Sequence, residues 1–208
     1  MPLPAGSWTV VAHLPITSPE GDRLDSAIVA RIERSAVVGM MLLISSDPRK
    51  PTIKDRRDAV GCDRNDFYLS RGFVSPDGST EECMRVTCSL PHNWKSSPRL
   101  VPVFRAAYAE LERRHVAIPE VLVQAGFDLW ARSQMLTTIY YFNPAAEGIA
   151  LGSPSGWDKY EVEKSARRAA YVARVKSWGA HWWPAMRASF AGSLKAAGPA
   201  PGGVKAWP

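Results

Sequence analysis

The sequence predicts an α+β protein, with a mainly antiparallel sheet of about five to seven strands and two longer helices packed on it. Several short stretches alternate apolar and polar side chains with a period of two, which is typical of half-buried strands. Two longer stretches repeat their apolar residues at helical spacing. The 208 residues, of which 46% are hydrophobic, suit one domain, which we place at residues 1–195. Residues 196–208, rich in Gly, Pro and Ala, predict a disordered C-terminal tail.

The chain is organised around residues 121–144, which carry only two charged side chains. Residues 121–129 alternate as a half-buried strand does. Residues 135–142 are apolar or amphipathic at both parities, so we expect this second strand to be covered on both sides. A reversal at residues 131–134 would join the two strands, and Asn143-Pro144 would end the second one.

The N-terminal third predicts three further strands, at residues 8–12, 26–32 and 36–44. A tight turn at residues 33–35 would join the last two. The third strand is apolar on both faces and therefore suits a central position in the sheet. Residues 45–58 predict a solvated loop, because acidic and basic side chains interleave there.

Two more strands are expected at residues 67–69 and 82–90. They are connected by a turn at residues 75–78, whose sequence is Ser-Pro-Asp-Gly, and Pro91 would end the second strand.

Helices are predicted at residues 98–115 and 161–181, both packed on one face of the sheet. We expect Pro184 to kink or restart the second helix, with a shorter amphipathic piece ending near Leu194. The second helix carries one aromatic stripe, made of Tyr171, Val175, Trp178 and Trp182.

The net charge of +6 lies entirely at the C-terminal end, because the first 150 residues carry 17 basic and 17 acidic side chains. This asymmetry defines a candidate contact surface for an unknown protein partner or an anionic surface. Three interpretations of this helix remain: packing on the sheet, which we favour, binding at a membrane surface, and binding of nucleic acid, which we disfavour. The candidate surface consists of Arg167, Arg168, Arg174, Trp178 and Trp182.

The three cysteines allow two interpretations. Cys88 shares strand parity with apolar residues and is expected to be a buried thiol, whereas Cys83 faces the polar side. If a disulfide forms, Cys62–Cys83 is the preferred pair. Three reduced thiols in a cytoplasmic protein are the alternative.

A zinc site made of Cys62, Cys83, Cys88 and His92 is disfavoured, because the spacing lacks two close ligand pairs. We therefore expect no metal and no cofactor, and we assign no catalytic residue. A small hydrolase-like enzyme centred on Cys62 to Asp66, with His13, His92 or His115 as the base, remains an alternative. No apolar run is long enough to span a membrane, and the N-terminus does not predict a signal peptide.

Short motifs spread over the chain resemble bacterial cell-envelope-type proteins of uncharacterised function. The motifs are LPAGSW at residues 3–8, CDRND at residues 62–66 followed by Cys83, YYFNP at residues 140–144, and Trp178, Trp182, Phe190 and Gly192. The resemblance implies a periplasmic or envelope location and a disulfide, but no reaction. The leading hypothesis is therefore a non-catalytic envelope or interaction module, with a cytoplasmic location as the alternative.

Overall fold

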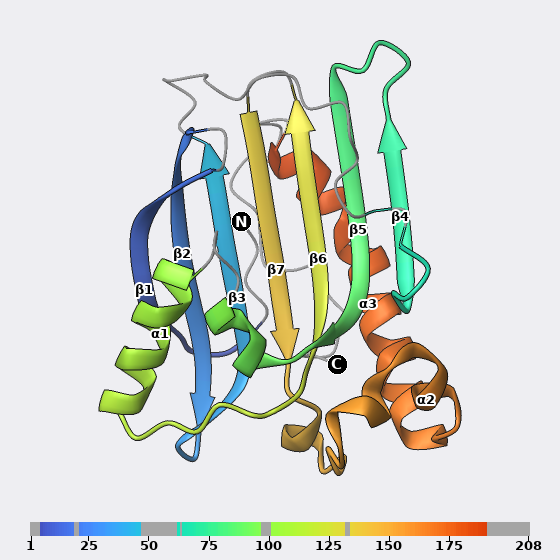
Figure 1. Ribbon diagram of the computed structural model, residues 1–208. Helices are drawn as coiled ribbons and strands as arrows, with labels where there is room; N and C mark the ends of the chain where they lie inside the picture. The colour runs from blue at the N-terminus through green and yellow to red at the C-terminus, as the bar shows by residue number, and fades with distance from the viewer. Residues whose placement is uncertain are drawn as a thin grey trace.

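The computed structural model has one sheet in which all neighbouring strands are antiparallel (Figure 1). It describes residues 5–18, 21–46, 62, 64–96, 101–131 and 134–190. The strand order is β1-β2-β3-β7-β6-β5-β4, and the predicted α+β class is confirmed. The strands are β1 (Trp8–Thr17), β2 (Arg23–Glu33), β3 (Ala36–Ser46), β4 (Leu69–Val74), β5 (Thr80–Ser89), β6 (Leu122–Ala131) and β7 (Gln134–Phe142).

The sheet consists of two halves that meet at its centre. Strands β1 to β3 form one half, strands β4 to β7 form the other, and β3 pairs with β7 from Gly39↔Phe142 to Ser45↔Leu136. The central position predicted for β3 is therefore confirmed. Strand β7 is covered on both faces, as predicted, because Tyr140 and Tyr141 point to opposite sides and both are buried.

Of the three predicted reversals, the two that lie wholly within the described residues are present. Between β2 and β3, Arg34 and Ser35 have φ values of 49° and 59°, the left-handed conformation that a two-residue hairpin turn requires. Between β4 and β5, the Gly78 N–H donates to the Ser75 carbonyl at 2.8 Å, and Gly78 has a φ of 66°. Glycine suits this position because it adopts positive φ without strain.

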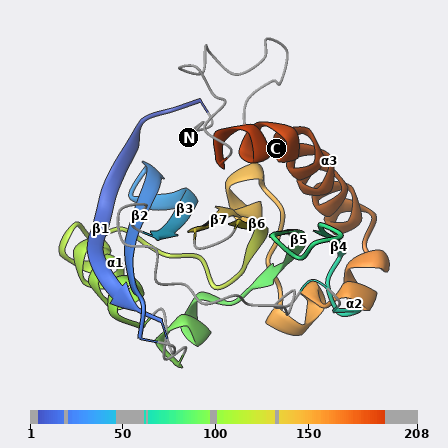
Figure 2. The same cartoon turned by 90° about the horizontal axis from the view of Figure 1, so that it is seen from above.

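The two long helices lie on opposite faces of the sheet, so the expectation that both would share one face is wrong. In Figure 1, helix α1 (Val101–Arg113) lies in front of β1 and β2, and helix α3 (Ala166–Phe190) lies behind β5 and β6. Figure 2 shows the sheet edge-on between the two helices. The helices lie on opposite faces because β7 carries apolar side chains on both of its faces, and each face needs a covering helix.

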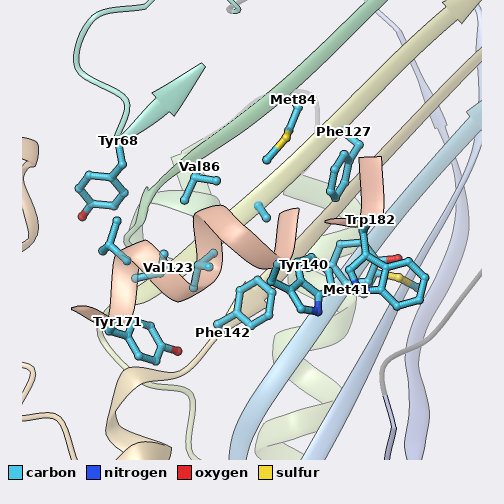
Figure 3. Packing of buried hydrophobic residues seen from close by; sticks show 14 of the residues in the cluster. Met41, Tyr68, Met84, Val86, Val123, Phe127, Tyr140, Phe142, Tyr171 and Trp182 are labelled. Atoms are coloured by element: carbon cyan, nitrogen blue, oxygen red, sulfur yellow. The ribbon is translucent and has the colours of Figure 1, made fainter. Parts of the chain in front are cut away.

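Helix α3 covers its face of the sheet with the predicted aromatic stripe. Tyr171, Val175, Trp178 and Trp182 are all buried there. Figure 3 shows part of the resulting cluster, in which Met41, Met84, Phe127, Tyr140 and Phe142 of the strands meet side chains of the helix. Trp178 has its ring centroid 4.8 Å from that of Tyr140 and 4.9 Å from that of Phe142, both edge-to-face.

The C-terminal helical region is divided differently from the prediction. A short helix α2 (Lys159–Glu163) precedes α3, and Ser165 begins the longer helix because its carbonyl accepts the Ala169 N–H at 2.8 Å. Helix α3 then continues through Pro184 to Phe190 as one helix, so it does not restart at Pro184. Pro184 and Ala180 are both exposed, so the carbonyl that loses its N–H partner can be hydrated.

Three 3₁₀ turns complete the described part of the chain: η1 (Pro91–Ser96), η2 (Pro144–Glu147) and η3 (Pro154–Trp157). Asn143 ends β7 as predicted, because its side-chain oxygen accepts the Ala145 N–H and caps η2. A loop is predicted at residues 45–58, but Ser45 and Ser46 belong to β3, and residues 47–58 lie outside the described residues. The same holds for residues 132–133 of the predicted reversal, for the end expected near Leu194 and for the predicted tail at residues 196–208.

Candidate ligand-binding site

A pocket of about 690 Å³ lies at the end of β5. Its walls come from β5, β6 and β7, from η1 and α1, and from two segments distant in sequence, residues 64–68 and 154–160. This volume is within the range of about 300–1,000 Å³ that is usual for pockets that bind small ligands.

The pocket exists because β4 is shorter than β5. Strand β5 pairs with β6 from Thr80 to Ser89, whereas its pairing with β4 stops at Leu69↔Val86. Among the described strands, none pairs with the outer edge of residues 87–89. The pocket occupies the space beside this open edge.

One side of the pocket is an aromatic group on the α1 face of the sheet, which we call the front aromatic group: Trp94, Phe104 and Tyr141. The ring of Trp94 stacks on Phe104 with 4.3 Å between centroids and lies 4.9 Å from Tyr141. Its indole Nε1 donates to the Ser89 hydroxyl at 2.9 Å. This hydrogen bond fixes the Trp94 ring against the end of β5.

The other side of the pocket is a second group, which we call the rear aromatic group: Tyr68 and Trp157. The Trp157 indole Nε1 donates to the Leu151 carbonyl at 2.7 Å, and the Tyr68 hydroxyl donates to the Trp157 carbonyl. Both side chains are buried on the α3 face of the sheet. The open edge of β5 therefore has aromatic side chains on both faces.

Arg168 holds the rear wall in place. Its guanidinium donates to the Gly156 carbonyl at 2.7 Å and to the Leu151 carbonyl at 3.0 Å, and it lies 5.2 Å from the Trp157 ring centroid. A Cβ atom at Gly156 would come within 2.3 Å of this guanidinium, so glycine leaves the space that Arg168 fills. Arg168 therefore supports the pocket wall instead of belonging to an exposed contact surface.

The rim of the pocket carries charges of both signs. Arg64 forms an exposed ion pair with Asp66, and this hydrogen-bonded pairing lowers the pKa of the Asp66 carboxyl. The Lys159 ammonium donates to the Asn65 carbonyl at 2.8 Å, which ties α2 to the opposite rim. Tyr160, also on the rim, is 69% exposed.

Two titratable side chains of the pocket, Cys88 and Tyr68, are neutral at physiological pH. Burial raises the pKa of the Cys88 thiol to about 12 and raises the pKa of the Tyr68 hydroxyl as well. A protonated thiol is a weak nucleophile, because the thiolate is the reactive form. The pocket thus offers apolar contact and hydrogen bonding more readily than nucleophilic attack.

The Cys62–Cys83 disulfide predicted from the sequence is present, with both residues 3% exposed and their Cα atoms 5.7 Å apart. Gly72, which pairs with Cys83, leaves room for it, because a Cβ there would lie 3.3 Å from the Cys62 sulfur. Cys88 is not in a disulfide and is partly exposed to the pocket, not fully buried as expected.

The cluster from Cys62 to Asp66 is not assembled as a nucleophilic site. The Cys62 sulfur is bonded, and the candidate bases His13, His92 and His115 are all exposed and lie outside the pocket lining. Within the described ranges, no three His, Cys, Asp or Glu side chains lie close enough to hold a metal ion.

The candidate contact surface on α3 is not continuous. Binding to a membrane or to nucleic acid through Trp178 and Trp182 would require exposed rings, but these residues are only 6% and 4% exposed. Arg174 forms an ion pair with Glu147, Arg168 supports the pocket, and Arg167 is exposed. Among helices in the described part of the chain, none has the length and apolarity to cross a bilayer.

Neither Trp94 nor Trp157 was expected from the sequence to line a site. A repeated local pattern could have indicated them, because Pro91 to Trp94 and Pro154 to Trp157 share the sequence Pro-x-x-Trp and both form 3₁₀ turns.

Comparison of the chain with protein-family models, with curated proteins and with solved structures finds no match.

Proposed function

We propose that this protein is a non-catalytic binding module of the cell envelope, and that its binding site is the pocket at the end of β5. The observation that carries this proposal is the pocket itself, which has aromatic walls on two sides and a volume suited to a ligand. Polar groups are interspersed among the rings, because Thr87 and Gln124 oppose each other on β5 and β6 and both line the pocket.

The chemistry of the pocket favours binding over catalysis. The Ser89 hydroxyl accepts the hydrogen bond of Trp94, and Cys88 and Tyr68 are held neutral by burial. General acid–base catalysis instead needs a group whose pKa lies near the working pH.

The envelope location is supported by the disulfide. Disulfides form and persist in oxidising compartments and are rare in the cytoplasm. The resemblance of the sequence to bacterial cell-envelope-type proteins points in the same direction.

A fragment library screened by ligand-observed NMR tests the proposal. Thr87→Trp should fill the pocket, because Thr87 is a half-buried lining residue. Thr17→Trp is the matched control, because Thr17 is exposed at the end of β1. We expect fragments that bind the wild type and Thr17→Trp but not Thr87→Trp. The proposal fails if no fragment binds, or if fragments bind Thr87→Trp as well as they bind the wild type.

A further inference from the structure

The open edge of β5 identifies the kind of ligand that this pocket fits, and the following inference rests on the function proposed above. Four consecutive residues line the pocket, namely Thr87, Cys88, Ser89 and Leu90. Successive side chains of a strand point to opposite faces of a sheet, so a pocket on one face would be lined only by alternate residues. The pocket therefore lies beside the edge of the strand.

An open strand edge presents unpaired backbone N–H and C=O groups. Proteins usually protect such edges with lysine, proline or a covering segment. Here the edge residues 87–89 include neither lysine nor proline, and the front and rear aromatic groups flank the edge without pairing with it. A single extended chain is narrow enough to reach this edge, whereas a second sheet would collide with the walls of the pocket.

The two aromatic groups match the side chains of an added strand. The front group packs in the cluster on the α1 face, and the rear group packs in the cluster on the α3 face. An extended peptide beside β5 would direct successive side chains to these two faces in turn. A flat small molecule would contact one group, but a peptide can contact both.

We propose that the pocket binds an extended peptide of three to four residues, which adds to the sheet as a short strand next to residues 87–89 of β5. The peptide lies next to β5 beyond Leu69, the first residue of β4. Its backbone pairs with β5, and two successive apolar side chains contact Trp94 of the front group and Tyr68 of the rear group, the rings of these groups that keep the most exposed surface, 8% each. Backbone pairing supplies affinity in this mode, and the side-chain contacts supply selectivity.

The test uses the full-length, disulfide-bonded protein and an array of N-acetylated, C-amidated hexapeptides varied at the four central positions. Fluorescence anisotropy measures the binding of the best sequences. We expect binders with large apolar residues at two adjacent positions, with Kd values of about 1 mM or tighter. Binding should be lost in Thr87→Trp and retained in Thr17→Trp.

N-methylation of the peptide backbone provides the decisive measurement, because it does not depend on any protein variant. Methylating every second amide should weaken binding about ten-fold or more, whereas methylating the amides between them should have little effect. Equal sensitivity at all amides, or at none, overturns the inference.

The same experiments separate this inference from the proposed function. If fragments bind in the pocket but no peptide does, the peptide inference is overturned and the binding function stands. If neither fragments nor peptides bind, both are overturned.

Discussion

Arg167 and Arg168 are adjacent on α3, but Arg168 contacts the wall of the pocket and Arg167 is exposed. Comparing the two tests whether Arg168 holds this wall in place. Arg168→Ala removes two hydrogen bonds from a charged donor to the Gly156 and Leu151 carbonyls, together with the contact with the Trp157 ring. Arg167 is exposed, so Arg167→Ala is the matched control with the same change in charge.

The magnitude follows from these contacts. Hydrogen bonds to charged groups contribute about 1.5–3 kcal/mol each, and a cation–π contact contributes about 0.5–1 kcal/mol. Because the freed carbonyls can be partly hydrated, we expect Arg168→Ala to lower the free energy of unfolding by about 3 kcal/mol. For Arg167→Ala we expect a change of less than about 0.5 kcal/mol.

Urea denaturation followed by tryptophan fluorescence measures both values. Arg168→Lys gives a further control, because a lysine carries the charge but cannot span two carbonyls with a planar fork. It should recover less than half of the loss. Equal effects of the two alanine variants would show that Arg168 does not hold the wall of the pocket.

Three other outcomes are expected. Replacing Cys62 and Cys83 with alanine should lower the free energy of unfolding by about 3 kcal/mol, given the sequence separation of 21. Iodoacetamide should add one label to the denatured wild type, and three labels would contradict the disulfide. Trp178→Ala should lower the free energy of unfolding by about 3–5 kcal/mol, because it leaves a cavity. Tyr160→Ala, at an exposed site, should change it little. Comparable losses of stability in the two denaturation curves would argue against the packing of α3. The pKa of Cys88 is raised to about 12, so the folded state keeps this proton when the unfolded state has lost it; the thermal midpoint should therefore fall between about pH 9 and pH 12, and it should fall less steeply in Cys88→Ala. Identical pH profiles for these two proteins would refute the raised pKa.

Most strands and their turns could be predicted from the sequence because they depend on local patterns, whereas β4 (Leu69–Val74) overlaps the strand expected at residues 67–69 only at Leu69. The alternation through residues 121–142 and the Ser-Pro-Asp-Gly turn each contain their own signal. The pairing Cys62–Cys83 could also be preferred, since strand parity separates Cys83 from Cys88, but the sequence left open whether a disulfide forms at all.

The position of α1 depends on long-range packing, and its face could not be read from its own residues. Both faces of β7 are apolar, so the sequence allowed a helix on either side. The continuation of α3 through Pro184 has a similar origin, because the exposure of Ala180 and Pro184 is known only once the helix is docked.

The pocket could not be predicted because it results from a difference in length between β4 and β5. Because β4 begins only at Leu69, the edge of β5 beyond Val86 is open, and no residue in β5 itself marks this change. The two tryptophans then reach the pocket from segments about 60 residues apart, which only the folded chain brings together.

The junction between β3 and β7 also determines how this protein must be assembled. Gly39 pairs with Phe142, so the N-terminal half of the sheet cannot find its neighbour until most of the chain has left the ribosome. Until then, Met40, Met41 and Leu42 lie on a strand that pairs with β2 but has its other edge open, and this edge could associate with other chains. Folding limited by such distant pairing is slow, in the range of about milliseconds to seconds. The nascent protein therefore passes through a period of exposure in which a chaperone would raise its yield.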